Sequence, residues 1–381
     1  MLPEELVTWY AAHGYQFLGI SDHNTVLDRE AWVSVQDALD RFGDAAPSLS
    51  AAGIKPISRM QDGIEQWRLL SIAELRRQYE RPDSFILLQN EEVTSDIAQA
   101  RIHIDAVNVP ETLAPAIEGD RAYVMTDVLG RIDNLSHRQD SPAIGIINHP
   151  NFAWALSADD LASVKAAKFV EIFNGHPSSA SRGDLDKPSV VRLWDIANAQ
   201  RVLEHAWPPL FGVAGDDTHA RHGASESSPG RGWIMVRARQ LQKADLIKAM
   251  QAGDFYASTG VTLKRCDFDS RRRALLLSVL PDAGVSYRIE FVVTKSNARP
   301  SALGAAENRW DGPGVGVVEK RTSALEAEYV LTPDDAYVRA TVTSSRAPRN
   351  PMKTNYTGDD VQFEQAFTQP VGWQQALSVH R

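Results

Sequence analysis

The first 260 residues alternate short apolar runs with amphipathic stretches, and this alternation limits the possible folds more than any other feature of the sequence. It is typical of β/α units, in which helices cover a sheet of largely parallel strands. The apolar runs expected to form strands are residues 17–20, 85–88, 102–107, 144–147, 169–173 and 210–214. The stretches expected to form helices are residues 4–13, 70–79, 127–138, 158–167, 190–200 and 241–252.

The pattern changes after Gly260. Later segments alternate apolar and polar residues with the two-residue period of a strand; these are residues 274–280, 286–293, 327–331 and 337–344. Turn-forming residues separate them, and no helix is expected among them. The sequence therefore predicts an α/β domain over residues 1–261 and a small antiparallel β-sandwich over residues 262–381.

Charge and cysteine content exclude several classes of protein and site. The net charge of −9 disfavours a nucleic-acid scaffold and leaves a small molecule as the expected partner. Cys266 is the only cysteine, which excludes an intrachain disulfide and a thiolate metal cluster. No membrane span or signal peptide is visible. The sequence as it stands predicts a cytoplasmic protein, or a periplasmic or secreted one if an upstream signal peptide has been omitted.

Histidine and acidic residues gather where the expected strands end. Directly after these strands come Asp22, His23, Glu91, Glu92, His149, Asn174, Asp216, Asp217 and His219. In a barrel of parallel strands, residues just beyond the carboxyl ends converge on one face. Imidazoles and carboxylates collected there destabilise one another unless a cation neutralises them. Nitrogen and oxygen donors suit zinc, manganese or iron, so the pattern predicts a metal site.

At these positions the chain resembles the PHP (polymerase and histidinol phosphatase) superfamily of metal-dependent hydrolases. Residues 19–24 (GISDHN) resemble its Asp-His motif, residues 90–93 (NEEV) lie where it has Gly-x-Glu, and residues 216–219 (DDTH) resemble its closing Asp-x-His. His103 and His149 match the two histidine positions between them. Later motifs resemble the CehA/McbA-like branch; they are residues 255–260 (FYASTG) and 368–371 (TQPV).

The resemblance implies a distorted, TIM-like (β/α)7 barrel followed by the β-sandwich. The superfamily opens with His-x-His on its first strand, whereas Met1 stands at what resembles the following helix. We therefore expect an N-terminally truncated barrel with an unpaired sheet edge. A late recorded start, a fragment and a natural truncation that has lost a metal all stay open.

The resemblance also implies two or three divalent ions, with zinc, manganese or iron as candidates. The implied metal ligands are His23, Glu92, His103, His149, Asp217 and His219. Glu92 would bridge two ions, and adjacent residues on a strand point to opposite sides, so Glu91 would face away. Asp22 and Asn174 would support the ligands through hydrogen bonds. The catalytic candidates are Glu92, Asp217 and His176.

The implied reaction is hydrolysis of an ester by metal-activated water. Phosphoesters are the expected substrates, cleaved by a phosphatase or phosphodiesterase activity. Arg101 and Arg221 are the candidate phosphate clamps, and Trp154, near His149, is the candidate pocket wall. A carboxylic or carbamate ester is the alternative substrate.

A second class of function competes with this one. The missing His-x-His favours a catalytically impaired metal-binding protein whose β-sandwich binds a carbohydrate or protein partner. A serine hydrolase is disfavoured, because the sequence has no Gly-x-Ser-x-Gly elbow.

Overall fold

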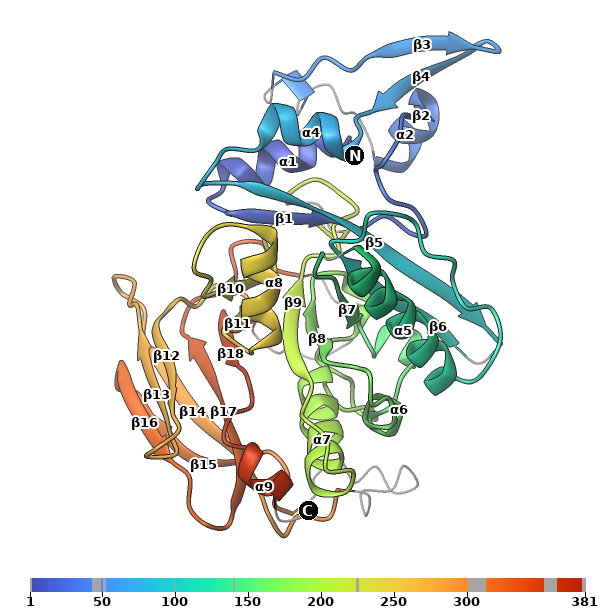
Figure 1. Ribbon diagram of the computed structural model, residues 1–381. Helices are drawn as coiled ribbons and strands as arrows, with labels where there is room; N and C mark the ends of the chain where they lie inside the picture. The colour runs from blue at the N-terminus through green and yellow to red at the C-terminus, as the bar shows by residue number, and fades with distance from the viewer. Residues whose placement is uncertain are drawn as a thin grey trace.

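The computed structural model describes residues 2–42, 49–50, 53–98, 100–139, 141–223, 226–300, 313–352 and 362–378. An α/β unit that carries a small projecting sheet lies beside a β-sandwich (Figure 1). None of the helices in these ranges combines the length and apolar character that a membrane span requires.

The six strands expected in the first part of the chain are present and form one sheet in the order β1-β5-β6-β7-β8-β9. They are β1 (Phe17–Ile20), β5 (Ile86–Ile97), β6 (Ala100–Val107), β7 (Ile144–Ile147), β8 (Phe169–Asn174) and β9 (Phe211–Gly215). Neighbouring strands run parallel except at β6, which is antiparallel to both β5 and β7.

The expected (β/α)7 barrel is therefore wrong. Among the described residues β1 pairs only with β5 and β9 only with β8, so the sheet is open as well as mixed. The antiparallel pairing of β5 with β6 follows from the short connection between them. Only two residues separate Ile97 at the end of β5 from Ala100 at the start of β6, and a parallel crossover needs about a dozen or more.

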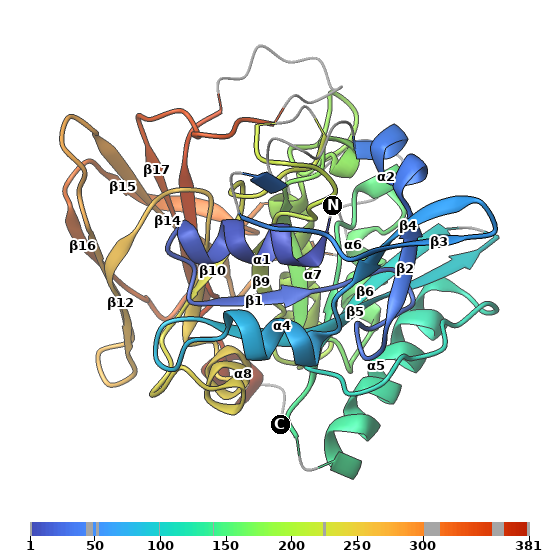
Figure 2. The same ribbon diagram turned by 90° about the horizontal axis from the view of Figure 1, so that it is seen from above.

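Helices pack on this sheet and bury its apolar side chains. They are α1 (Pro3–Ala12), α4 (Ile72–Tyr79), α5 (Arg121–Gln139), α6 (Ala158–Ser163), α7 (Val190–Leu203) and α8 (Lys243–Gln251). Helix α4 packs on β5, α5 on β6 and β7, and α7 on β8. Helix α1 lies along β1 (Figures 1 and 2). The resulting core joins Ile104 and Ile147 of the sheet to Leu161 and Trp194 of the helices.

A small three-stranded sheet projects from this unit between β1 and β5, at the top of Figure 1. Its order is β2-β4-β3. It consists of β2 (Ala31–Ser34), β3 (Ser58–Gln61) and β4 (Ile64–Leu69), accompanied by α2 (Val35–Phe42). Because β3 is exposed along its whole length, this sheet adds little to the core.

Two antiparallel sheets form the β-sandwich, in the orders β10-β11-β18-β17-β14-β15 and β12-β13-β16. The first contains β10 (Trp233–Val236), β11 (Phe255–Ser258), β14 (Tyr287–Lys295), β15 (Val317–Thr322), β17 (Asp335–Ser344) and β18 (Gln365–Thr368). The second contains β12 (Leu263–Asp269), β13 (Ala274–Val279) and β16 (Glu326–Val330), and α9 (Gln374–Ser378) follows. Strands β10 and β11 precede residue 261, so the larger sheet draws strands from both sides of the expected domain boundary.

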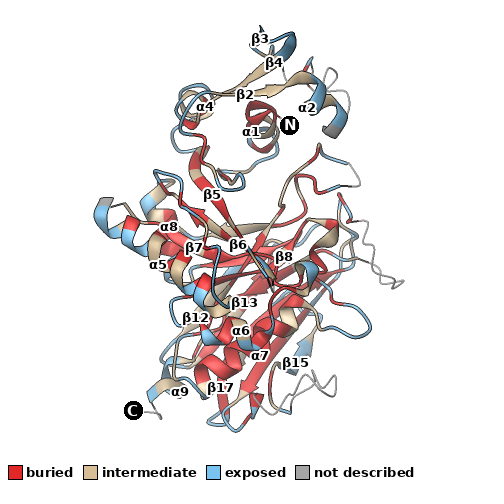
Figure 3. Cartoon of the chain, turned by 90° about the vertical axis from the view of Figure 1, so that its right-hand side faces the viewer, coloured by how far each residue is buried: buried red, intermediate tan, exposed pale blue. Residues whose placement is uncertain are grey.

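Strand β17 is buried along its whole length (Figure 3). Val338, Ala340 and Val342 point into the core of the sandwich. The alternate residues, among them Arg339 and Thr341, face the other way, and Arg339 contacts α7. The larger sheet is therefore covered on both faces, by the smaller sheet and by the α/β unit.

Candidate metal centre

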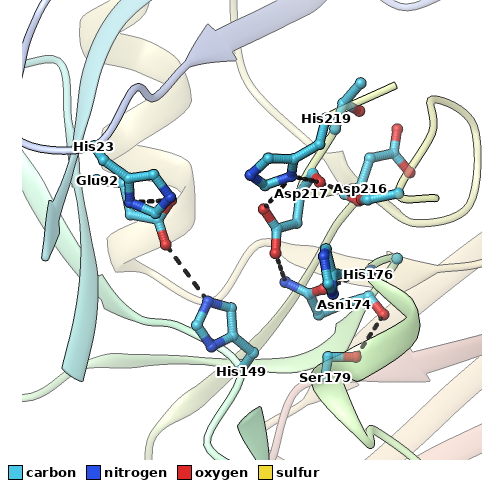
Figure 4. A network of polar contacts seen from close by, with 12 residues as sticks. His23, Glu92, His149, Asn174, His176, Ser179, Asp216, Asp217 and His219 are labelled. Atoms are coloured by element: carbon cyan, nitrogen blue, oxygen red, sulfur yellow. Dashed lines mark hydrogen bonds and ion pairs between the residues drawn. The ribbon is translucent and has the colours of Figure 1, made fainter. Parts of the chain in front are cut away.

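Glu92 lies at the centre of three imidazoles at the end of the sheet where β1 stops (Figure 4). Its Oε1 atom is 2.6 Å from Nδ1 of His103 and 3.4 Å from Nε2 of His149. Its Oε2 atom is 3.4 Å from Nδ1 of His23. Glu92, His103 and His149 are buried, whereas the His23 side chain is 48% exposed. Four of the predicted metal ligands thus lie together.

The backbone after β1 fixes His23 against Glu92. The two residues form a parallel bridge, in which the backbone N–H of Glu92 donates to the carbonyl of Asp22 and that of Asn24 donates to the carbonyl of Glu92. Asn24 has a φ of 53°, a left-handed conformation that asparagine tolerates and that turns the chain away after His23. The Asp22 side chain lines the cavity beside the site.

The antiparallel ladder between β5 and β6 places His103. Thr94, two residues beyond Glu92, pairs with His103. Residues two apart on a strand share a face, so His103 lies diagonally opposite Glu92 on the same side of the sheet. His149 enters from the end of β7, and its backbone N–H donates to Oε2 of Glu171 at 2.8 Å.

The donor set fits a divalent cation. One donor atom from each of His23, Glu92 and His103 lies within 4.8 Å of the other two. Nε2 of His103 is buried and has no hydrogen-bond partner among the described residues. Burying such a group without a partner costs free energy, and a metal ion is a partner that an imidazole nitrogen can bind. Imidazole and carboxylate donors together suit zinc, manganese or iron.

Asp217, His219 and His176 form a second group across the site (Figure 4). Nδ1 of His219 is 3.3 Å from Oδ1 of Asp217, and the His219 ring is 5.5 Å from the His176 ring. Asn174 donates from Nδ2 to Oδ2 of Asp217 at 3.2 Å. The rings of His23 and His219 are 6.2 Å apart, so the two groups face each other.

Two pairs of adjacent acidic residues, Glu91/Glu92 and Asp216/Asp217, lie at the site. In each pair one carboxylate points away from the imidazoles. Oδ2 of Asp216 accepts from the Tyr10 hydroxyl at 2.6 Å, and its two oxygens also accept from the backbone N–H groups of residues 230–232. Glu91 is buried in the apolar interior, where its Oε2 accepts from the backbone N–H of Leu113. Burial raises the pKa of Glu91 to about 7. Glu92 and Asp217 are therefore the members that face the site.

The site carries a negative field that favours cations. Burial disfavours charge on Glu92, but hydrogen bonds from His103 and His149 outweigh burial and hold the pKa of this carboxyl well below its usual range. Burial also disfavours charge on His149, yet Glu92, Glu171 and Asp217 outweigh it and raise the pKa of this imidazole to about 9. The field that charges His149 would also attract a metal ion.

Two further buried acids, Glu171 and Asp105, lie near these residues. Oε2 of Glu171 accepts from the backbone N–H of His149 and from Nδ2 of Asn174, which links the two groups, and burial raises the pKa of Glu171 to about 7. Burial also raises the pKa of Asp105 well above its usual value. The sequence analysis missed Asp105, because it lies within a strand and not after one. Asp105 follows His103 by two residues, and this spacing would have predicted that both side chains lie on the same face of the strand.

A cavity of about 1310 Å³ opens beside these groups. Residues 16–23 around β1 and residues 214–219 after β9 both line it, and so does Glu92. Apart from histidines, its aromatic lining residues are Trp9, Tyr10, Tyr15, Phe17, Trp32, Trp67 and Trp233. A cavity of this size admits a small organic molecule to the side chains of His23, Glu92 and Asp217.

The predicted substrate-binding residues are dispersed. Arg101 is exposed and pairs with Asp96 at 2.6 Å. Arg221 lines the cavity, with its Nε donating to Oε1 of Glu5 at 2.6 Å. Trp154 is half-buried, and neither it nor Arg101 belongs to the cavity lining.

Phe152, which the sequence analysis did not single out, is the aromatic residue beside the imidazoles. Its ring centroid is 5.2 Å from that of His149, 6.0 Å from that of His103 and 6.2 Å from that of His176. Phe152 therefore packs against the imidazoles, although it does not belong to the cavity lining either.

No protein-family model matches the chain, and a search of curated proteins finds no matching sequence.

Proposed function

We propose that this protein is a metal-dependent hydrolase that cleaves an ester, with phosphoesters as the preferred substrate class. One observation carries the proposal: His23, Glu92 and His103 converge, and a buried imidazole nitrogen of His103 has no partner among the described residues. The similarity of residues 90–93 and 216–219 to PHP-superfamily motifs supports the same class.

The chain offers ligands for two or three ions of zinc, manganese or iron. The proposed ligands are His23, Glu92, His103, His149, Asp217 and His219. The chemistry that such ions supply is a lowered pKa of water and stabilisation of negative charge on the ester oxygens. Glu92 keeps its charge at neutral pH because its pKa is lowered. Asn174 holds Asp217 in place through a hydrogen bond of 3.2 Å.

His176 is the proposed donor to the leaving oxygen. Its Nδ1 atom accepts from the backbone N–H of Ser178 at 3.1 Å, so the neutral ring carries its proton on Nε2. Burial lowers the pKa of His176, which keeps the ring neutral near pH 7. Because the ring lies beside His219, its Nε2–H group is placed to donate towards an ester held at the proposed metal ligands.

A carboxylic or carbamate ester is the second candidate substrate, and one observation favours it. Both arginines expected to clamp a phosphate have carboxylate partners, Asp96 for Arg101 and Glu5 for Arg221. A neutral ester would not require either arginine to exchange its partner.

The test begins with the metal content of the purified protein after reconstitution with Zn²⁺ or Mn²⁺. Hydrolysis of p-nitrophenyl phosphate, bis(p-nitrophenyl) phosphate and p-nitrophenyl acetate then distinguishes the substrate classes. We expect Glu92→Gln to lower metal affinity at least about tenfold and turnover at least about a hundredfold, since it weakens several ligand contacts at once.

His137→Ala is the matched control, because His137 is exposed on α5 and pairs only weakly with Asp133 at 3.4 Å. It should leave both quantities unchanged. Stoichiometric metal without turnover on any of the three esters would instead support the catalytically impaired metal-binding protein. Equal metal affinity in wild type and Glu92→Gln would refute the proposed centre.

A further inference from the structure

A second cavity, of about 440 Å³, lies between the α/β unit and the β-sandwich. On one side its wall is formed by the end of β8 and the start of α7. On the other side it is formed by the outward face of β14, β17 and β18. The volume falls within the range of about 300–1,000 Å³ that is usual for small-molecule sites. Among the described residues, Thr259 is the only one that lines both this cavity and the larger cavity beside the proposed metal centre.

The charged residues of this lining are all basic. Arg182, Arg231 and Arg288 line the cavity, and no aspartate or glutamate does so among the described residues. The whole chain has the opposite balance, with 49 acidic and 40 basic residues. Guanidinium groups bind carboxylates and phosphates through paired hydrogen bonds. The lining therefore selects for an anion.

Arg231 is fixed in the wall. Its side chain is only 2% exposed, and its Nη1 atom donates to the carbonyl of Gly175 at 2.7 Å. Burial lowers the pKa of Arg231, and the negative charges of Asp216 and Glu226, which do not belong to the lining, offset part of this effect. Arg288 is more accessible, and its Nε atom is 3.6 Å from a carboxylate oxygen of Glu290. A buried guanidinium and an exposed one thus border the same space.

Two hydroxyl groups of β17 add neutral donors. Oγ1 of Thr341 accepts from Nη1 of Arg339 at 3.0 Å, and Oγ1 of Thr343 accepts from Nε2 of Gln365 at 3.2 Å. A hydroxyl that accepts one hydrogen bond still has its own hydrogen to donate. Each hydroxyl therefore keeps its hydrogen, which it can donate to a molecule in the cavity.

The remaining wall mixes apolar and polar side chains, and it includes three aromatic rings, those of Phe173, Phe363 and Phe367. Such a wall suits an organic body better than a bare inorganic ion. We propose that this cavity binds a small organic carboxylate, whose charged group lies between Arg231 and Arg288 and whose apolar part contacts the phenylalanines. This site is independent of the proposed metal centre.

Calorimetric titration with benzoate tests the proposal, with benzamide as the neutral isostere. We expect benzoate to bind at least about tenfold more tightly than benzamide, because only benzoate can form the charge-assisted hydrogen bonds. Arg288→Gln should weaken benzoate binding about tenfold. Arg272→Gln is the matched control, because Arg272 has a similar exposure but pairs with Glu328 outside the cavity.

Thr343→Val, which preserves shape but removes the hydroxyl and with it the acceptor for Nε2 of Gln365, should also weaken benzoate binding, about threefold to tenfold. Glu92→Gln should leave benzoate affinity unchanged, which separates this cavity from the metal centre. Equal affinities for benzoate and benzamide would overturn the proposal. So would equal benzoate affinity in Arg288→Gln and Arg272→Gln, or loss of binding in Glu92→Gln.

Discussion

Arg339 of β17 and Asp195 of α7 form a buried bidentate ion pair that joins the β-sandwich to the α/β unit. Nε of Arg339 lies 2.7 Å from Oδ1 of Asp195, and Nη2 lies 2.7 Å from Oδ2. The guanidinium also packs over the ring of Trp194, at 5.1 Å from its centroid. The charges therefore satisfy each other at a place that water does not reach.

Removing one member of this pair is expected to be strongly destabilising, because the other charge would stay buried without its partner. Arg339→Met or Asp195→Asn should lower the free energy of unfolding by about 3–5 kcal/mol. The double variant Arg339→Met/Asp195→Asn should lose less than the sum of the two single losses. Urea denaturation measures all three, and strict additivity would contradict the pairing.

Tyr10→Phe should lower the free energy of unfolding by about 1–2 kcal/mol, because it removes the hydroxyl that donates to the buried Asp216 carboxylate. The loss is limited, since the backbone N–H groups of residues 230–232 still bind that carboxylate. Tyr123→Phe, at an exposed position of α5, is the control and should change stability by less than about 0.5 kcal/mol. Thermal unfolding that ranks the two variants equally would count against this role of Tyr10.

Asn174→Ala should weaken metal binding about tenfold to a hundredfold without unfolding the protein, because Asn174 orients Asp217 and also binds Glu171. Competition with a chromogenic zinc chelator measures the affinity. Asn134→Ala, on the exposed face of α5, should match wild type. Unchanged zinc affinity in Asn174→Ala would show that Asp217 needs no such support.

Asp335 should make part of the stability depend on pH. Its carboxylate accepts from Nζ of Lys295 at 2.8 Å, the Tyr329 hydroxyl at 3.0 Å and the backbone N–H of Thr332 at 2.8 Å. Burial disfavours its charge, but these donors outweigh burial and lower the pKa of Asp335. A carboxyl with a lowered folded pKa stabilises the fold above its unfolded pKa of about 3.9 and loses this effect as pH falls through the folded value.

The wild type should therefore lose more free energy of unfolding between about pH 6 and about pH 2 than Asp335→Asn does. Comparing the two proteins cancels the contributions of the other carboxyls. Parallel stability curves over this interval would show that Asp335 contributes nothing to the acid dependence.

Several residues that the sequence singled out lie together in the structure, whereas the barrel expected around them was predicted wrongly. The strands and their polar ends could be recognised because burial leaves long apolar runs, and alternation along a strand explains why Glu92 faces the site and Glu91 does not. The direction of β6 was predicted wrongly, because an apolar run does not show which way its strand runs in the sheet. The short connection from Ile97 to Ala100 was the feature that required an antiparallel pair. The contact of Phe152 with His149 could not be predicted, because the sequence does not show the left-handed backbone of Ala153 and Trp154, whose φ values are 50° and 56°.

The contact between Tyr10 and Asp216 also bears on how the protein is made. The two residues are 206 positions apart, so at a synthesis rate of about 5–20 residues per second roughly 10–40 s separate their appearance. Val7 on the same helix packs with Leu75 and Leu87, which emerge much earlier. On the ribosome, apolar contacts would hold α1 first. The hydrogen bond between Tyr10 and Asp216 would form only after more than half of the chain has been translated.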